Sequence, residues 1–417
     1  MENISTAPVI EPENMPEPKK KLGKPEIFMI LAVIFGGTPY FSSIFSTAFS
    51  RIVYSIAEEF PEIITLISTV ANGVISNVFS VIFTVISVIV YVLFAYFSYK
   101  KFRKALRFLG AVFAAETLMS LLDRTWGVFS KFVTNLSADV GLKIAPEDLS
   151  MVMLVITTVV TMICLIVSAA AGVIILMIFE GKIKIQKKEK SPASQENISE
   201  NPAIEPENNK PKKKKLGKPE VFMLLSLILA QGVLNIGLNF IQSIVTTVLN
   251  MIYPMFVSGS GDYVAKLICD TLFNITNYVF DASEIILGFA VIVVFAFMAY
   301  KKMKRRAAFI GIAFAATKIS WLLAYGPLSS IRNIISTIVS AVCMQLMDEG
   351  SLSFQDYSTI LIVQSTVVGL SEFVFMFIGM AVAAVSGLLI LMAVNGKLKK
   401  KKKEPEAVET SEITETY

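Results

Sequence analysis

Six charged or amide residues interrupt long apolar stretches of the chain, and they are the residue types best suited to chemistry there. They are Glu116, Gln231, Asn235, Asp281, Glu284 and Lys318. Ionisable groups within lipid are costly, so they face the interior of a helix bundle, where they pair or line a path for a solute. The set therefore predicts an intramembrane polar pathway. The alternative is that these side chains only hold helices together, as amides and ion pairs often do.

Polar residues recur at helical spacing in two neighbouring stretches. Successive members are three or four residues apart, which places each series on one helix face: Gln231, Asn235, Asn239 and Gln242, then Asn274, Asn277, Asp281 and Glu284. At 1.5 Å per residue, the positions nearest the flanking basic clusters lie about 18–28 Å from them. The pattern predicts a polar vestibule at this depth, close to Lys318.

The elements that hold these residues are predicted from composition. The chain is 54% hydrophobic and only 17% charged, whereas ordinary soluble domains are about 25% charged. The apolar runs are continuous and exceed the roughly 20 residues that a spanning helix needs. We therefore expect an all-α polytopic membrane protein. The net charge of +5 then reflects membrane orientation, and we expect no binding of nucleic acid.

A repeated stretch divides the chain. The sequence of Lys19 to Glu26 returns letter for letter from Lys213 to Glu220. We expect a tandem duplication of a four-helix transmembrane module, with a first module at 19–190 and a second at 213–403. The segments 1–18, 191–212 and 404–417 are rich in Pro, Glu, Asn and Lys, which predicts disorder. The eight expected spans lie at 27–50, 70–99, 106–130, 150–179, 221–247, 271–300, 307–340 and 357–394.

Basic clusters predict the orientation. They flank the spans of both modules on one face, and the loops on the other face are mixed or acidic. By the positive-inside rule both termini are cytosolic, and the modules are parallel repeats. The basic loops would also suit anionic lipid headgroups, although topology alone explains them. The Ile-, Lys- and Asn-rich sequence is typical of a bacterial protein, so we expect a multi-pass protein of the bacterial cell membrane.

Small residues recur at matched places in the third and fourth spans and predict close helix packing. They are Gly110, Ala114, Ser168, Gly172, Gly311, Ala315, Gly379, Ala383 and Gly387. In the first span, Gly36 to Pro39 could break the helix, as in transporter helices. The stretch has no counterpart in the second module, so a proline kink is favoured there. Arg124, beside Asp123 and Trp126, is expected to anchor the outer interface. A disulfide between Cys269 and Cys343 is left open.

Enzyme chemistry finds little support. The chain has no His, and no metal-ligand spacing, Gly-x-Ser-x-Gly elbow or P-loop is present. We expect no catalytic residue, no metal and no cofactor. Two hypotheses remain. The first is a transporter or channel-like protein with an outward-facing polar vestibule in the second module. The alternative is a non-catalytic membrane scaffold or assembly partner that acts through helix packing and its tails.

Overall fold

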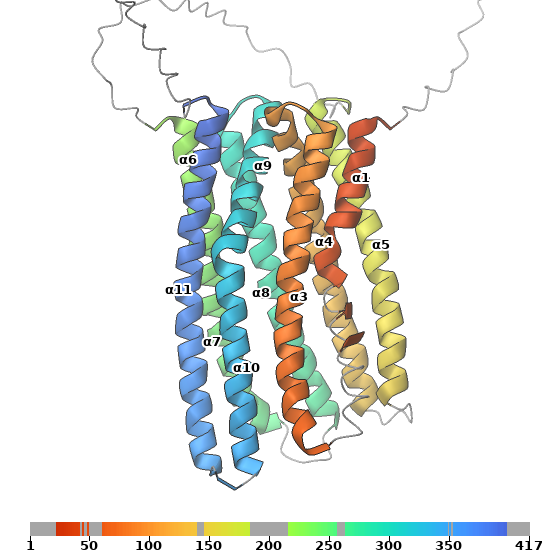
Figure 1. Cartoon of the computed structure of the whole chain (residues 1–417), viewed down its shortest axis with the longest axis vertical. Helices are drawn as coiled ribbons and strands as arrows, with labels where there is room; N and C mark the ends of the chain where they lie inside the picture. Colours follow the sequence, from red (N-terminus) through yellow and green to blue (C-terminus); the bar gives the residue numbers. More distant parts are fainter. Residues whose placement is uncertain are drawn as a thin grey trace, which may run out of the picture.

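The computed structural model describes residues 22–41, 44–45, 48–49, 61–139, 146–183, 216–256, 263–348, 350–351 and 353–397, and every regular element in these ranges is a helix (Figure 1). The elements are α1 (Lys24–Gly36), η1 (Thr38–Phe41), α3 (Pro61–Ser98), α4 (Phe102–Asp139), α5 (Pro146–Glu180), α6 (Lys218–Ile228), η2 (Leu229–Val233), α7 (Leu234–Phe256), α8 (Tyr263–Ala299), α9 (Met303–Ser320), η3 (Trp321–Tyr325), α10 (Gly326–Asp348) and α11 (Phe354–Val394). The three segments expected to be disordered lie outside these ranges.

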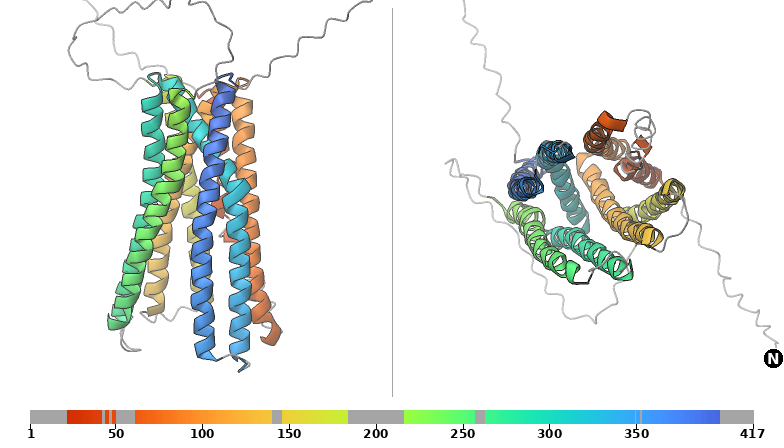
Figure 2. Two further views of the ribbon diagram at one scale, coloured as in Figure 1. Left: turned by 90° about the vertical axis from the view of Figure 1, so that its left-hand side faces the viewer. Right: turned by 90° about the horizontal axis from the view of Figure 1, so that it is seen from below.

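The helices form one elongated bundle along a common axis (Figure 1). The short basic connections between α3 and α4 and between α8 and α9 lie at the same end as the start of α1 and the end of α11. We call this end the basic end. Seen from the opposite end in Figure 2, the helices within residues 22–183 and those within residues 216–397 form two neighbouring groups, named here the N-terminal half and the C-terminal half.

Seven helices of the described residues are long and apolar enough to cross a membrane, which indicates an integral membrane protein. Eight spans were expected. The missing one is the first, because α1 has only 13 residues and ends at Gly36, about 20 Å long. The favoured proline kink is wrong, and the alternative of a broken helix is what the structure shows. The chain leaves the α-helix after Gly36 and forms the 3-10 turn η1.

The helices are longer than the predicted spans. α3, α4 and α8 have 38, 38 and 37 residues, and α11 has 41. These lengths correspond to about 55–62 Å, whereas a bilayer core is about 30 Å thick. The helices therefore extend beyond the hydrocarbon. Two further long helices are continuous in the chain and contain one π-helical turn each. They are α6–η2–α7 and α9–η3–α10.

The two halves meet most closely where α4 crosses α9. A Cβ atom added at Gly311 would lie 1.8 Å from the carbonyl oxygen of Leu106, and one at Gly110 would lie 2.6 Å from the carbonyl oxygen of Ala307. Such contacts leave room for hydrogen alone, so the two backbones approach as small-residue helix pairs in membranes do. Gly110 and Gly311, two of the predicted small residues, therefore lie at the seam between the halves.

Small residues also pack inside each half. Gly172 of α5 faces Met29 and Ala115, and Gly387 of α11 faces Met223 and Ala316. Ser168 and Ala383 are 0% exposed, and Gly379 accepts a hydrogen bond through its carbonyl oxygen from Ser320. Ala114 and Ala315 are only partly buried, and their neighbours Ala115 and Ala316 are the fully buried ones. The predicted stripe on the third span is therefore displaced by one residue.

Both halves are closed at the basic end by a buried glutamate and a lysine. Glu26 in the first turn of α1 pairs with Lys182, which follows α5. Glu220 in the first turn of α6 pairs with Lys397, which follows α11, at 2.9 Å. Each glutamate is 1% exposed. A buried carboxylate needs such a partner, so the repeated Pro-Glu motif ties the first helix of each half to its last.

Glycine places each of these lysines. Gly181 and Gly396 follow the last helix of their half with φ of 78° and 73°. The next residue in each case, Lys182 or Lys397, donates its backbone N–H to a carbonyl oxygen of the final turn, at 2.9 Å. This is the Schellman motif, which favours glycine at the left-handed position. It turns the chain back over the helix end, so the lysine side chain reaches the glutamate.

Candidate functional site: a polar cavity in the C-terminal half

A cavity of about 400 Å³ lies among the helices of the C-terminal half and reaches α4. It is lined by Arg124, Gln231, Asn235, Asn239, Glu284, Thr317, Ser320, Trp321, Tyr325, Glu372, Met376, Gly379 and Met380. On α6–α7, α8, α9 and α11, the lining residues nearest the basic end are 13 to 15 residues from the helix end there, or about 20 Å along the axis. Small-molecule sites usually occupy about 300–1,000 Å³, so the volume suits a small solute.

Two π-helical turns supply part of the lining. Gln231 lies in η2, and Trp321 and Tyr325 are the first and last residues of η3. A π-turn inserts a residue into an α-helix, and such insertions are frequent at functional sites. Here each insertion lies at the level of the cavity. The backbone irregularity thus brings polar or aromatic side chains to a place that a regular helix would line differently.

The charged groups around the cavity are mostly paired. Arg124 of α4 forms an ion pair with Asp281 of α8. Glu372 of α11 lies 3.0 Å from a guanidinium nitrogen of Arg332 and accepts a hydrogen bond of 3.2 Å from the hydroxyl of Tyr325. Among the described residues, Glu284 has no ion-pair or hydrogen-bond partner for its side chain. It is the one lining charge without a direct partner in that part of the chain.

The balance of charge suggests what the cavity binds. Asp281, Glu284 and Glu372 are opposed by Arg124 and Arg332, which leaves one negative charge in excess. Trp321 and Tyr325 add aromatic rings, whose faces attract cations. The amides of Gln231, Asn235 and Asn239 can donate and accept hydrogen bonds. The arrangement suits a small polar solute that carries a positive charge.

The six sequence candidates separate into two groups. Gln231, Asn235 and Glu284 line the cavity, and Asp281 holds Arg124 at its edge. Lys318 and Glu116 do not line it and form an ion pair with each other between α9 and α4. Their side chains are 20% and 15% exposed. This pair joins the two halves, so the structure does not bring all six residues into one pathway.

Sequence reasoning missed several lining residues. The sequence places Arg124 at the outer interface with Asp123 and Trp126 and does not predict that it lines the cavity, about 33 Å along α4. Trp126 donates to the hydroxyl of Thr157 at 3.2 Å. Glu372 is an ionisable residue within a long apolar run, and that pattern could have predicted its place in the cavity. Nothing in the sequence distinguishes Trp321 and Tyr325, because the π-turn that positions them has no sequence signature.

Some predicted polar residues form hydrogen bonds between or within helices. Gln242 of α7 donates to the side chain of Asn277 on α8 at 3.1 Å. Asn239 donates to the backbone carbonyl of Asn235 one turn earlier on α7, at 2.9 Å. The structure gives Cys269 and Cys343 as free thiols, so they do not form the disulfide that was left open. The polar faces of α7 and α8 therefore combine helix contacts with cavity lining.

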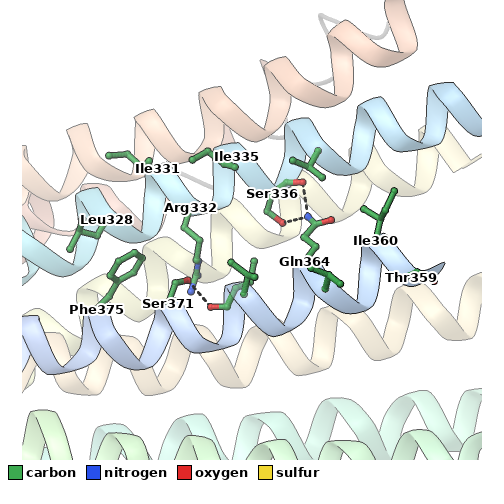
Figure 3. A pocket seen from close by; sticks show the side chains of 14 residues that line it. Leu328, Ile331, Arg332, Ile335, Ser336, Thr359, Ile360, Gln364, Ser371 and Phe375 are labelled. Atoms are coloured by element: carbon green, nitrogen blue, oxygen red, sulfur yellow. Dashed lines mark hydrogen bonds between the residues drawn. The ribbon is translucent and has the colours of Figure 1, made fainter. Parts of the chain in front are cut away.

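A second hollow lies between α10 and α11 and has a volume of about 580 Å³ (Figure 3). Its walls are apolar, and Ile331, Ile335 and Val363 are more than half exposed. Gln364 on its floor already donates to the hydroxyl of Ser336 at 2.6 Å, and Arg332 is paired with Glu372. This groove offers apolar contact and differs in character from the polar cavity.

Comparisons with known proteins add no relative: no protein-family model, curated protein or solved structure matches the chain. Within the described ranges, no cluster of three or more His, Cys, Asp or Glu side chains could hold a metal ion. The site must therefore be interpreted from its own geometry.

Proposed function

We propose that the protein is a transporter or channel-like protein, and that the polar cavity of the C-terminal half forms part of its solute path. The observation that carries the proposal is Glu284, a carboxylate on a membrane helix that lines a cavity and lacks a direct partner among the described residues. Charges at membrane depth are usually paired or functional. A positively charged solute or ion would neutralise Glu284 on entering.

The proposed architecture is a tandem duplication with both termini in the cytosol. Matched contacts at the basic end support the duplication, since Glu26 and Lys182 correspond to Glu220 and Lys397. Gathering of the basic loops at one end supports the orientation. In this arrangement the basic end faces the cytosol, and the cavity lies toward the outer half of the membrane.

The experiment tests whether water reaches the cavity from both sides. A cysteine is placed at Asn235 after the three native cysteines, Cys164, Cys269 and Cys343, are replaced by alanine. Membrane-impermeant thiol reagents are then added outside or inside vesicles that carry the full chain. Val294→Cys in α8 is the matched control, because Val294 is 53% exposed on the apolar surface of the bundle. A thiol facing lipid does not ionise and reacts slowly with water-soluble reagents.

A transport pathway predicts labelling of Asn235→Cys from both sides, in different conformations, and little labelling of Val294→Cys. Protection by added organic cations would identify Asn235 as part of the solute path. Adding Glu284→Gln should leave the labelling pattern intact but remove that protection. Labelling from neither side, in a correctly inserted protein, would contradict the proposal.

The second candidate function is a membrane scaffold, which the seam between the halves favours. Gly110 and Gly311 bring α4 and α9 into backbone contact, and Glu116 pairs with Lys318 across the same seam. Such a seam resists relative movement of the halves. A scaffold predicts a cavity that is reached from one side at most and unaffected by cations, so the same labelling distinguishes the two functions.

A further inference from the structure

A separate pocket of about 250 Å³ opens at the basic end, where the two halves meet. It is lined by Tyr99, Lys104, Arg107, Glu180, Lys182 and Lys304. These residues come from the ends of α3, α5 and α9 and from the first turns of α4. The pocket is about 20 Å from the polar cavity along the bundle axis, and the solute path proposed above does not use it.

The pocket carries an excess of positive charge. Four cations face the single carboxylate of Glu180, which is 2.7 Å from Lys182. Lys182 also neutralises Glu26. For Lys104, Arg107 and Lys304, no ion pair with any described residue is present. At least two positive charges are therefore uncompensated even after Glu26 is counted.

Arg107 contributes a guanidinium group that no described residue pairs with. Its Nε atom is buried and has no acceptor among the described residues. No ion pair or hydrogen bond from its other guanidinium nitrogens to a described residue is present either, and the side chain lines the pocket. A charged donor without an acceptor is costly, and most such donors in native proteins are satisfied. The outer N–H groups of Arg107 are therefore available to an acceptor that enters the pocket.

The positive-inside pattern does not explain this pocket. That pattern requires cations near the membrane, and it is met equally in both halves. The positions that correspond to Arg107 and Glu180 in the C-terminal half are Ala308 and Asn395. There Asn395 donates to Glu220 at 2.9 Å, which reinforces the ion pair. Arg107 and Glu180 of the basic pocket therefore have no equivalent in the C-terminal half.

We propose that this pocket binds a phosphate group that carries one or two negative charges. A guanidinium with flexible ammonium groups around it complements phosphate oxygens through charge-assisted hydrogen bonds. The start of α4 lies beside the pocket and contributes the positive end of its helix dipole. The phosphate belongs either to the headgroup of a membrane lipid or to a soluble phosphate from the aqueous side.

The test measures retention of phosphatidic acid by the full-length protein in phosphatidylcholine nanodiscs that contain it. Native mass spectrometry counts the lipid retained. Lys104→Gln with Lys304→Gln is expected to reduce the apparent affinity at least tenfold, and Arg107→Gln is expected to reduce it further. Lys104 and Lys304 are exposed, so their replacement should leave the fold intact. The double lysine variant therefore still tests the proposal if Arg107→Gln fails to fold. Arg305→Gln is the matched control, because Arg305 is an exposed neighbour of Lys304 outside the pocket.

A second arm identifies the source. Inorganic phosphate and pyrophosphate are titrated into protein in nanodiscs of phosphatidylcholine alone. If calorimetry detects binding of phosphate or pyrophosphate and the same variants abolish it, the ligand is a soluble phosphate. If phosphatidic acid is retained but neither soluble anion binds, the ligand is a lipid headgroup. The proposal is overturned if neither binds, if Arg305→Gln weakens binding as much as the pocket variants, or if oleate, an anion without phosphate, is retained equally well.

Discussion

The two halves make the same contacts at the basic end of the bundle but differ in its interior. At the basic end, Glu26 and Lys182 in one half correspond to Glu220 and Lys397 in the other. Lys24 lies over the ring of Phe28 at 5.4 Å, and Lys218 lies over Phe222 at 5.5 Å. The repeated residues thus make repeated contacts, which fix the first helix of each half against the last.

About 20 Å further along the axis the likeness ends. In the C-terminal half the cavity is lined by Asn235, Ser320, Gly379 and Met380, and the aligned residues of the N-terminal half are Phe41, Met119, Cys164 and Leu165. The latter form an apolar cluster with Tyr40. Tyr40 and Ser120 share a hydrogen bond of 2.6 Å inside it. One half is thus filled where the other is hollow.

The backbone differs at the same level. α1 ends at Gly36 and turns into η1, which carries Tyr40 and Phe41 into the apolar cluster. Residues Leu229–Val233, which align with residues 35–39, form the π-turn η2 inside a continuous helix. Both halves thus have an irregular turn at this level, although the Gly36 to Pro39 sequence occurs in the N-terminal half only. The comparison teaches that the two halves share their contacts at the basic end and differ in their interiors.

The largest expected loss of stability comes from a substitution at the seam between the halves. Gly311→Ala places a Cβ atom within 1.8 Å of the Leu106 carbonyl oxygen. Overpacking usually costs about 1–3 kcal/mol, and a clash with backbone is expected to cost about 4 kcal/mol or to prevent folding. Thermal unfolding of purified protein measures it. Gly237→Ala is the control, since its Cβ meets nothing within 4 Å. A stable Gly311→Ala protein would mean that the halves are not packed at this seam.

The next effect tests the ion pair that joins the halves. Lys318→Met leaves Glu116 partly buried without its cation, which is expected to cost about 2–3 kcal/mol, below the ~3–5 kcal/mol of a fully buried pair because both side chains are partly exposed. Glu116→Gln combined with Lys318→Met should recover most of this loss. Denaturant unfolding of the wild type, of Lys318→Met, of Glu116→Gln and of the double variant closes the cycle. Additive losses in the double variant would show that the two residues do not interact.

The two ion pairs at the basic end should differ in strength. Lys182→Gln removes the side-chain partner of Glu26, whereas Lys397→Gln leaves Glu220 a side-chain hydrogen bond from Asn395. Both lysines are more than one third exposed, so we expect losses of about 1–2 kcal/mol, larger for Lys182→Gln. Chemical unfolding of each variant measures them. Equal losses would remove the distinction between the halves at this end.

The smallest effect concerns pH. Burial raises the pKa of the Glu26 carboxyl, but hydrogen bonding and charge from Lys182 outweigh it, so the pKa lies below the ordinary 4.5. The pair therefore stabilises the fold above about pH 4.5, and this contribution is lost as pH falls through the lowered pKa. The pKa of Lys182 is raised, despite burial, by Glu180 and Glu26, so nothing is lost near neutral pH.

Melting temperatures of the wild type and Glu26→Gln, recorded from about pH 7 to about pH 3, check this sign. The difference between them should be constant near neutral pH and shrink in acid. A difference that grows on acidification would contradict the assignment of Glu26 as an ionised, paired carboxylate.

Some of this structure follows from sequence. Long apolar runs predict the membrane helices, because lipid admits little else. The spacing of Gln231, Asn235 and Glu284 predicts residues that line the cavity, since each polar series occupies one helix face. The repeated Pro-Glu motif predicts matched positions, although its pairing with Lys182 or Lys397 depends on a helix turn that brings distant residues together.

Other features depend on long-range geometry. Arg124 lines the cavity of the other half only because α4 crosses the seam beside α8. The π-turns η2 and η3 have no sequence signal, and they decide which residues of their helices face the cavity. By sequence, Lys318 could pair with Glu116 or with Glu284, and only the positions of α4 and α9 select Glu116.

One measurement tests the central claim that the C-terminal half is hollow and wetted where the N-terminal half is filled. Asn235→Cys and Phe41→Cys, aligned positions in the two halves, are each placed in the protein lacking native cysteines. Their rates of reaction with a water-soluble thiol reagent are then compared in vesicles. The account predicts that Asn235→Cys reacts at least tenfold faster. Equal rates, or faster reaction of Phe41→Cys, would contradict it.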